Sequence, residues 1–238
     1  MQQKTDSYVC VDLETTGLNP KTDRIIEIGA VKIENGKKAG VFESFVCPGR
    51  QLTDKIKELT KITDAQLQNA PDIHSVLPEL LDFMGDSILL GHSVLFDYSF
   101  LKKAAVNEKL TFERQGIDTL KIARTFLQEL ESRSLDFLCK FYDIPHKAHR
   151  ALADAEATCL LFERLYEEFG EREEAQKQFA PYQLIYNVKR ETPITPAQKE
   201  RLYKLLSKHK LTVDYDVDKL TRNEASRYTD RILARYGR

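Results

Sequence analysis

The sequence lacks the features that mark secreted, membrane-spanning or zinc-binding proteins. It has no tryptophan, and its four cysteines form no CxxC pair and no zinc-site spacing: Cys10, Cys47, Cys139 and Cys159. Cys10 and Cys159 stand in apolar patterns typical of small core residues in a reducing compartment. No apolar run approaches the ~20 residues that a membrane span needs, and the polar start MQQKTDSYVC has no hydrophobic signal region. We therefore expect a cytoplasmic protein with no membrane contact.

The charges of the chain nearly cancel, but they are unevenly distributed. The 238 residues carry a formal net charge of −1. Residues 195–238 contain 11 Lys and Arg against 6 Asp and Glu, whereas the preceding 194 residues contain 25 against 31. A basic tail on an acidic body suggests contact with nucleic acid, although a solvated helical face explains the tail equally well.

Hydrophobic periodicity predicts a mixed α/β sheet. Apolar runs at 8–13 and 86–92 are typical of buried strands. Ile26, Ile28 and Ala30 alternate with polar neighbours, and Asn35-Gly36 predicts a hairpin turn into a partner strand, VFESFVC. With a short strand at 116–118, this makes five strands. Three antiparallel strands followed by strand–helix alternation predict a mixed five-stranded sheet flanked by helices.

Helix signals divide the chain into three parts. Capping patterns predict helix starts at Thr63, Ser134, Thr195-Pro196 and Thr221. A long helix over 150–169 ends at Gly170, and the charged, proline-interrupted stretch that follows predicts a linker. The expected domains are therefore 1–170, a linker over 171–194, and a small basic helical unit over 195–238. About 44 residues can hardly build an independent core, so we expect this unit to dock on something.

An acidic pair stands at the end of the first strand. Asp12 and Glu14 are two residues apart, so both side chains leave the same face. Two such carboxylates repel unless a cation lies between them, and hard divalent ions take oxygen ligands of this kind. A surface acidic pair is the better explanation for these two residues alone. The Thr15-Thr16-Gly17 turn after them exposes N–H groups suited to a phosphate or a terminal hydroxyl.

Two further polar groups follow later in the chain. Asp97 lies in the first turn of the helix after the 86–92 strand, where the helix dipole favours an aspartate in any protein. His92 ends that strand and would usually be a hydrogen-bonded strand-end histidine, but the ends of strands in α/β sheets are where ligand sites gather. Asp154 adjoins the buried face of the 150–169 helix and needs a metal or cationic partner. His149 precedes it and, with a pKa of ~6.5, can accept a proton from water; we interpret His146 as a loop residue outside the site.

Three motifs carry a resemblance to a known family. DLETTG, GHSxxFDxxFL and HRAxxDAxAT occur in this order over residues 7–168, together with IIEIGAVK and LTKITDAQLQNAP. They resemble the exonuclease motifs of the DnaQ-like superfamily in its DEDDh branch, and are most similar to the epsilon and PolC proofreading exonucleases of bacterial replicative polymerases. The histidine-x4-aspartate spacing indicates the histidine branch. One departure is Ser93, where many relatives have asparagine; it removes no metal ligand.

The resemblance implies an RNase H-like fold and a two-metal site. Asp12, Glu14, Asp97 and Asp154 would bind two Mg²⁺ or Mn²⁺ ions, typically ~3.5–4 Å apart, with His149 as the general base. The terminal nucleotide would be bound by Thr15, Thr16, Gly17, His92 and Phe96.

The implied activity is 3′–5′ hydrolysis that releases nucleoside 5′-monophosphates. We expect single-stranded or frayed DNA ends as substrate, in proofreading or repair, with a DNA polymerase as a candidate partner. RNA 3′-end trimming is the alternative, because discrimination rests on contacts to the 2′ position. A non-catalytic module that binds nucleic acid or a polymerase would be favoured by a missing ligand, and none is missing. A clamp-binding motif is not clear, since YQLIY (182–186) is better explained as an apolar patch.

Overall fold

The computed structural model describes residues 5–213 and 215–237, which belong to two compact units. Unit 1 comprises the chain through Pro48 together with Leu52–Val188, and unit 2 comprises Gly49–Gln51 and the chain from Lys189 onward. Within the described ranges, no helix has both the length and the apolar character that crossing a bilayer requires.

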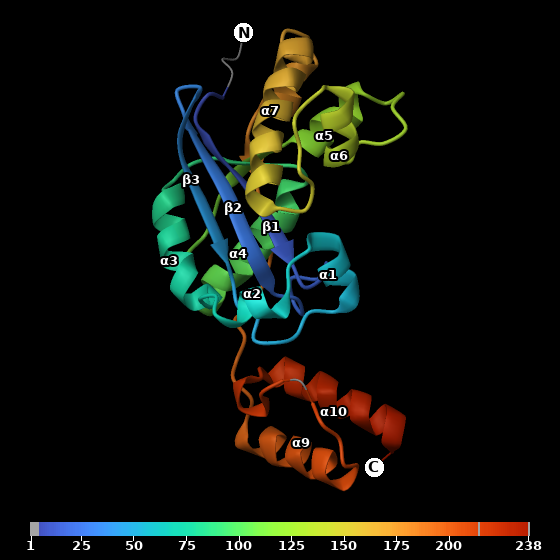
Figure 1. Ribbon diagram of the computed structural model, residues 1–238. Helices are drawn as coiled ribbons and strands as arrows, with labels where there is room; N and C mark the ends of the chain where they lie inside the picture. The colour runs from blue at the N-terminus through green and yellow to red at the C-terminus, as the bar shows by residue number, and fades with distance from the viewer. Residues whose placement is uncertain (1–4, 214, 238) are drawn as a thin grey trace. The chain divides into compact units, whose positions relative to one another are not determined.

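A six-stranded mixed sheet forms the centre of unit 1 (Figure 1). The strand order is β3-β2-β1-β4-β5-β6; β1 pairs antiparallel with β2 and parallel with β4, and β6 pairs antiparallel with β5. The strands are β1 Tyr8–Thr15, β2 Ile25–Glu34, β3 Lys37–Phe45, β4 Leu89–Gly91, β5 Gln115–Asp118 and β6 Tyr182–Gln183. The predicted mixed sheet is confirmed, but it has six strands rather than five.

Short-range signals in the sequence set many element boundaries. Asn35 and Gly36 form the predicted turn, with positive φ angles of 52° and 71°. Thr63, Thr195 and Thr221 each cap a helix through a capping box. The helices of unit 1 are α1 Asp54–Thr60, α2 Asp64–Gln68, α3 Ile73–Met84, α4 Val94–Asn107, α5 Thr119–Phe126, α6 Leu135–Phe141, α7 Ala151–Phe169 and α8 Ala175–Phe179.

The two faces of the sheet carry two separate hydrophobic clusters. Side chains alternate along β1, so Tyr8 and Cys10 pack with residues of α5, α6 and α7, whereas Val9 and Val11 pack with residues of α3 and α4. Figure 1 shows α7 running along the β1–β2 part of the sheet, with α3 on the other side. Asp12 and Glu14 continue the Tyr8–Cys10 side of the strand, which therefore points them toward α7.

The predicted linker over 171–194 is largely part of unit 1. Ala175 and Phe179 of α8 are buried in the cluster that contains α7, and the Phe179 ring lies 5.2 Å from Tyr166 and 5.9 Å from Phe162. β6 then adds the sixth strand, and the boundary between the units falls at Val188. The charged residues 171–174 favour a linker in the sequence analysis, because only a few aromatic side chains farther along pack the segment onto unit 1.

Unit 2 contains α9 Pro196–Lys208, a 3-10 turn η1 Val217–Lys219, and α10 Arg222–Tyr236. It has a small cluster of its own, formed by buried Ile194, Leu202, Leu205, Leu206, Val217, Leu220, Ala225 and Ile232. Arg50 joins the unit through an ion pair with the buried Glu224, at 2.7 Å. The expected docking of this unit stays a prediction.

Candidate active site

The ends of β1 and β4 place the first site residues. These strands are parallel neighbours, so the turn from β4 into α4 lies beside the end of β1. Asp97, in the first turn of α4, is buried and accepts a hydrogen bond of 3.0 Å from the backbone N–H of Leu13. A residue 84 positions away in the chain is thereby fixed between Asp12 and Glu14 along β1.

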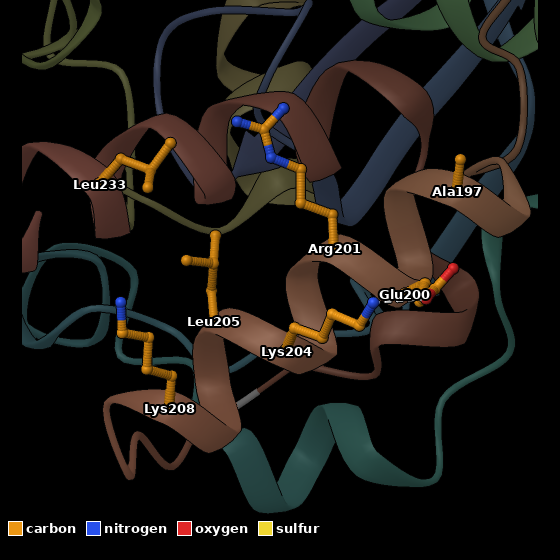
Figure 2. Close-up of a pocket in the computed structure, with 7 residues that line it drawn as sticks. All are labelled: Ala197, Glu200, Arg201, Lys204, Leu205, Lys208 and Leu233. Atoms are coloured by element: carbon orange, nitrogen blue, oxygen red, sulfur yellow. Dashed lines mark hydrogen bonds and ion pairs between the residues drawn. The ribbon is translucent and has the colours of Figure 1, made fainter. Parts of the chain in front are cut away.

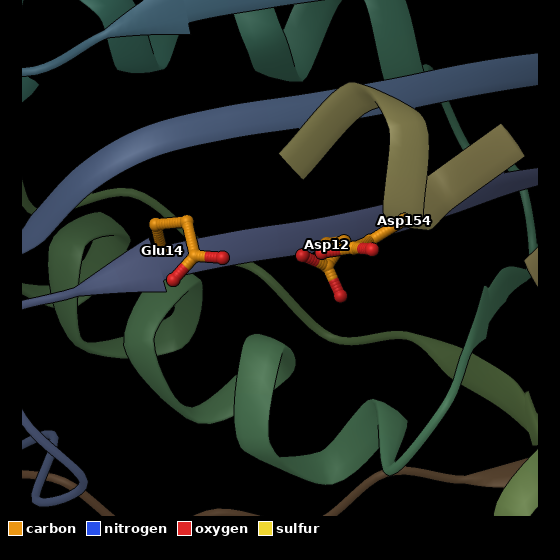
Figure 3. Close-up of side chains that lie close together, drawn as sticks. All are labelled: Asp12, Glu14 and Asp154. Atoms are coloured by element: carbon orange, nitrogen blue, oxygen red, sulfur yellow. The ribbon is translucent and has the colours of Figure 1, made fainter. Parts of the chain in front are cut away.

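Helix α7 brings Asp154 to the same place. Its first turn lies directly on β2 at Gly29, where a Cβ atom would come within 2.1 Å of the Ala151 carbonyl carbon and the Leu152 nitrogen. Only glycine permits this approach. One carboxylate oxygen from each of Asp12, Glu14 and Asp154 then lies within 4.8 Å of the others (Figure 3).

Burial raises the pKa of every carboxyl in this group. The pKa of Asp12, whose side chain is half-buried, is raised well above its usual range, first by burial and then by the charges of Asp97, Asp154 and Glu14. The pKa of Glu14 rises to about 8, again by burial first and then by Asp154. Burial likewise raises the pKa values of Asp97 and Asp154.

This electrostatic situation tests whether a divalent cation fits. Four neighbouring carboxyls cannot all stay ionised in a buried site without positive charge among them. The group offers only oxygen ligands, the donor type that Mg²⁺ and Mn²⁺ prefer. Asp12, Glu14 and Asp154 therefore fit a metal site, and Asp97 stands beside them as a further oxygen donor.

His149 stands at the open side of this group. Its side chain is 46% exposed, and its Nδ1 atom lies 4.0 Å from Glu14 Oε1. The backbone has φ +65°, a left-handed conformation that is uncommon for a residue with a Cβ. Its backbone N–H donates to Asp154 Oδ2 at 3.0 Å, so the same carboxylate that faces Asp12 also fixes the histidine segment.

His146 lies in a loop, as predicted, but its ring contacts Asp154, so our interpretation of it as lying outside the site was wrong. Its ring is only 6% exposed, and Nε2 is hydrogen-bonded to Asp154 Oδ1. Asp154 is thus held from both oxygens, by the His146 ring and by the His149 backbone. Nothing in the local sequence indicates this, because the segment is irregular and the contact spans eight residues.

An ion pair between the buried Glu27 and the partly exposed Arg150 anchors the start of α7. Glu27 on β2 is fully buried, and its Oε1 accepts hydrogen bonds from Arg150 Nε at 3.0 Å and from Nη2 at 2.8 Å. Its Oε2 accepts from the backbone N–H of Ala151 at 3.2 Å. Because Arg150 directly follows His149, this pair fixes the position at which the His149 loop enters α7. Sequence reasoning missed both residues.

The predicted nucleotide-binding residues lie around the ends of β1 and β4. Thr15 Oγ1 donates to the carbonyl of Gly17 at 2.7 Å, and Thr16 Oγ1 accepts from the backbone N–H of Arg24 at 3.0 Å. The backbone N–H of Thr16 donates to the carbonyl oxygen of Arg24 at 2.8 Å, so the prediction that this N–H is exposed for a phosphate was wrong. Phe96 packs on Phe100, with the ring centres 5.1 Å apart.

His92 is held within the protein by both ring nitrogens. Nδ1 lies 2.9 Å from Thr119 Oγ1, and Nε2 lies 2.8 Å from the carbonyl oxygen of Arg133. Burial lowers its pKa, which favours the neutral ring. His92 lines a cavity of about 580 Å³, and Arg124 and Arg133 line the same cavity. The neighbouring Ser93 has φ 77° and donates its backbone N–H to Asp118.

Comparison with known proteins gives consistent similarities. The RNase_T exonuclease family model matches residues 9–162. A PolC-type DNA polymerase III of Caldanaerobacter subterraneus subsp. tengcongensis is 41% identical over 166 residues, which are 69% of this chain and 12% of that protein. The PolC-type DNA polymerase III of Bacillus subtilis is 33% identical over 246 residues, or 96% of this chain and 17% of that protein. The chain thus spans less than a fifth of the length of these relatives.

Solved structures share the fold. The nuclease domain of 3′hExo, a DEDDh family member bound to rAMP, has a TM-score of 0.61 at 21% identity, over 76% of this chain and 98% of that chain. Exonuclease X in complex with 5′ overhanging duplex DNA has a TM-score of 0.57 at 24% identity, over 72% of this chain and 98% of that chain. At these identities the likeness concerns the fold alone.

Proposed function

The chain belongs to the DnaQ-like 3′–5′ exonucleases, a hydrolase family whose exonuclease model covers residues 9–162, and on that basis we propose that it shortens DNA strands from their 3′ ends with two divalent cations. The products would be nucleoside 5′-monophosphates. One observation carries the proposal: oxygens of Asp12, Glu14 and Asp154 converge within 4.8 Å, beside the buried Asp97.

The carboxylates would hold Mg²⁺ or Mn²⁺, and His149 would handle the proton. When bound, two such cations lower the pKa of an attacking water and offset the charge on the leaving 3′-oxygen. The His149 ring is solvent-accessible on the Glu14 side of the group, where it can accept the water proton. Asp154 fixes the histidine backbone, so the base and one ligand are positioned by a single side chain.

The Thr15-Thr16-Gly17 turn would receive the terminal nucleotide. It follows Glu14 directly, and hydrogen bonds within the turn and to Arg24 support its backbone. We propose Phe96 as an apolar contact to the sugar or base. We propose that His92 supports the conformation of the β4 end and does not itself hydrogen-bond the nucleotide, because both of its ring nitrogens already bind protein oxygens.

We propose DNA rather than RNA as the substrate, because the similar curated proteins are DNA polymerases and the structure of Exonuclease X was solved with DNA. A polymerase context follows from the same similarity, with frayed or mismatched primer ends as the natural substrate. RNA is the second candidate, since another structure of this fold is a 3′-exonuclease that recognises a histone mRNA stem-loop.

Digestion of 5′-labelled single strands tests the proposal. Matched DNA and RNA strands are incubated with Mg²⁺ and the wild type, Asp12→Ala or His149→Ala. We expect a one-nucleotide ladder on DNA that both substitutions abolish or strongly reduce. The exposed Asp82 and His74 supply control variants, Asp82→Ala and His74→Ala, which should keep full activity. Activity without metal, or unchanged in Asp12→Ala, contradicts the mechanism; faster digestion of RNA reverses the substrate assignment.

A further inference from the structure

Helix α9 presents a row of basic side chains on one face. Arg201, Lys204 and Lys208 are spaced by three and four residues, so they project from the same side of the helix, and all three are exposed. The opposite side carries Leu202 and Leu206, which are buried in the core of unit 2. The row is therefore a surface of the unit and contributes nothing to its core.

These side chains border a cleft between α9 and α10. Its volume is about 420 Å³, and it is lined by Ala197, Glu200, Arg201, Lys204, Leu205, Lys208 and Leu233. Figure 2 shows the three basic side chains around Leu205, with Leu233 contributed from α10. The cleft thus combines an apolar floor with basic walls.

The charge of the cleft is positive. Glu200 is the single acidic residue among those that line it, and it pairs with Lys204 at 2.6 Å. The residues that line the cleft thus include three basic side chains and one acidic side chain, and this excess of basic groups attracts a polyanion.

We propose that this cleft binds the phosphate backbone of a single nucleic-acid strand, which deepens the proposed exonuclease function and rests on it. Arg201, Lys204 and Lys208 would contact successive phosphates, while Leu205 and Leu233 would meet the sugars or bases. A positively charged groove that follows the phosphate backbone is the element that holds single strands without sequence preference, and the row on α9 supplies such charges. Such a contact would compensate for the net negative charge of residues 1–194, which repels a polyanionic substrate.

A second basic row on α10 provides the comparison. Arg227, Arg231 and Arg235 are spaced by four residues, like the α9 row. However, the guanidinium of Arg231 lies 5.7 Å from the Tyr228 ring and that of Arg235 lies 5.4 Å from the Tyr236 ring, so these side chains lie along the unit's own surface. Neither lines the cleft. The α10 row is therefore a matched control of equal charge.

The experiment measures binding of a fluorescein-labelled oligothymidylate to the full-length chain by anisotropy, over a series of salt concentrations. Asp12→Asn is present in every protein, so that binding is observed without digestion. The α9 variant carries Arg201→Gln, Lys204→Gln and Lys208→Gln, and the control carries Arg227→Gln, Arg231→Gln and Arg235→Gln. Circular dichroism and thermal unfolding confirm that each protein is folded, and the single Lys204→Gln variant provides a milder test.

We expect the α9 variant to bind about a hundredfold more weakly near 0.1 M salt and to lose about 2 from the slope of log K against log salt, because each phosphate contact to a single strand contributes about 0.7. The control should stay within about twofold of the parent. No loss in the α9 variant, or an equal loss in both, overturns the proposal. Poly-L-glutamate that competes as well as unlabelled oligothymidylate also overturns it. Hydrolysis of a mononucleotide p-nitrophenyl ester is measured separately in the wild-type protein, with Asp12 intact, and reports on the catalytic function alone. A wild-type protein that does not hydrolyse the ester, while its Asp12→Asn variant binds DNA through the α9 row, refutes the proposed function and leaves the cleft assignment standing.

Discussion

Replacing Glu14 by glutamine is expected to stabilise the metal-free protein near neutral pH while it abolishes exonuclease activity. Glu14 is 9% exposed and lies among other carboxyls that repel its charge. Its pKa rises from 4.5 to about 8. The folded protein therefore holds a proton on Glu14 at pH values where the unfolded chain has already lost it. For a raised carboxyl pKa, stability is greatest below about pH 4.5 and declines as the pH rises toward 8.

The magnitude follows from the shift. A rise of the Glu14 pKa from 4.5 to about 8 costs roughly 5 kcal/mol above pH 8 and about 3 kcal/mol at pH 7, because a tenfold change in proton affinity corresponds to about 1.4 kcal/mol. Glutamine has nearly the same shape and carries no charge, so Glu14→Gln removes this cost. In the wild type, Mg²⁺ binding should offset it instead, because the cation stabilises the ionised carboxylates.

The assay is urea unfolding at a series of pH values with EDTA, and again with saturating Mg²⁺. With EDTA, the free energy of unfolding of Glu14→Gln should exceed that of the wild type increasingly from pH 5 to 8. The control Glu79→Gln, at an exposed position on α3, should follow the wild type. With Mg²⁺ the advantage should shrink or reverse. A Glu14→Gln protein that is equally destabilised at pH 5 and pH 8 would refute the electrostatic account and point to a packing defect.

Two further predictions concern the residues that position α7 and Asp154. Gly29→Ala should lower the free energy of unfolding by about 3 kcal/mol and sharply reduce kcat, because the added Cβ would overlap the Ala151 backbone. The control Gly40→Ala should cost far less, because its Cβ meets only the Phe83 ring, at 3.3 Å. Equal losses of stability in urea unfolding would contradict this prediction. His146→Ala should raise the half-saturating Mg²⁺ concentration about 10–100-fold in the exonuclease assay, because the ring orients Asp154, and His146→Gln should restore part of the affinity. An unchanged metal requirement in His146→Ala would show that Asp154 needs no such support.

The sequence by itself determined the elements whose signals are local. The Asn35-Gly36 turn and the capping residues Thr63, Thr195 and Thr221 act on neighbours within a few positions, so they can be recognised without knowledge of the fold. Alternation along β1 likewise places Asp12 and Glu14 on one face. The approximate positions of the strands and long helices followed from the same periodicities, which is why the mixed sheet was predicted correctly.

Only the tertiary structure decided how the site is supported. Glu27 and Arg150 are 123 residues apart, and neither stands in a pattern that signals the other. His146 lies in an irregular segment without periodicity, and the short α8 and β6 are held by a few aromatic and edge contacts that composition conceals. The raised pKa values also depend on the tertiary structure, because β1, α4 and α7 together bury carboxyls that come from distant parts of the chain. The local sequence supplied the carboxylates, and long-range packing supplied the charge repulsion that a bound cation would relieve.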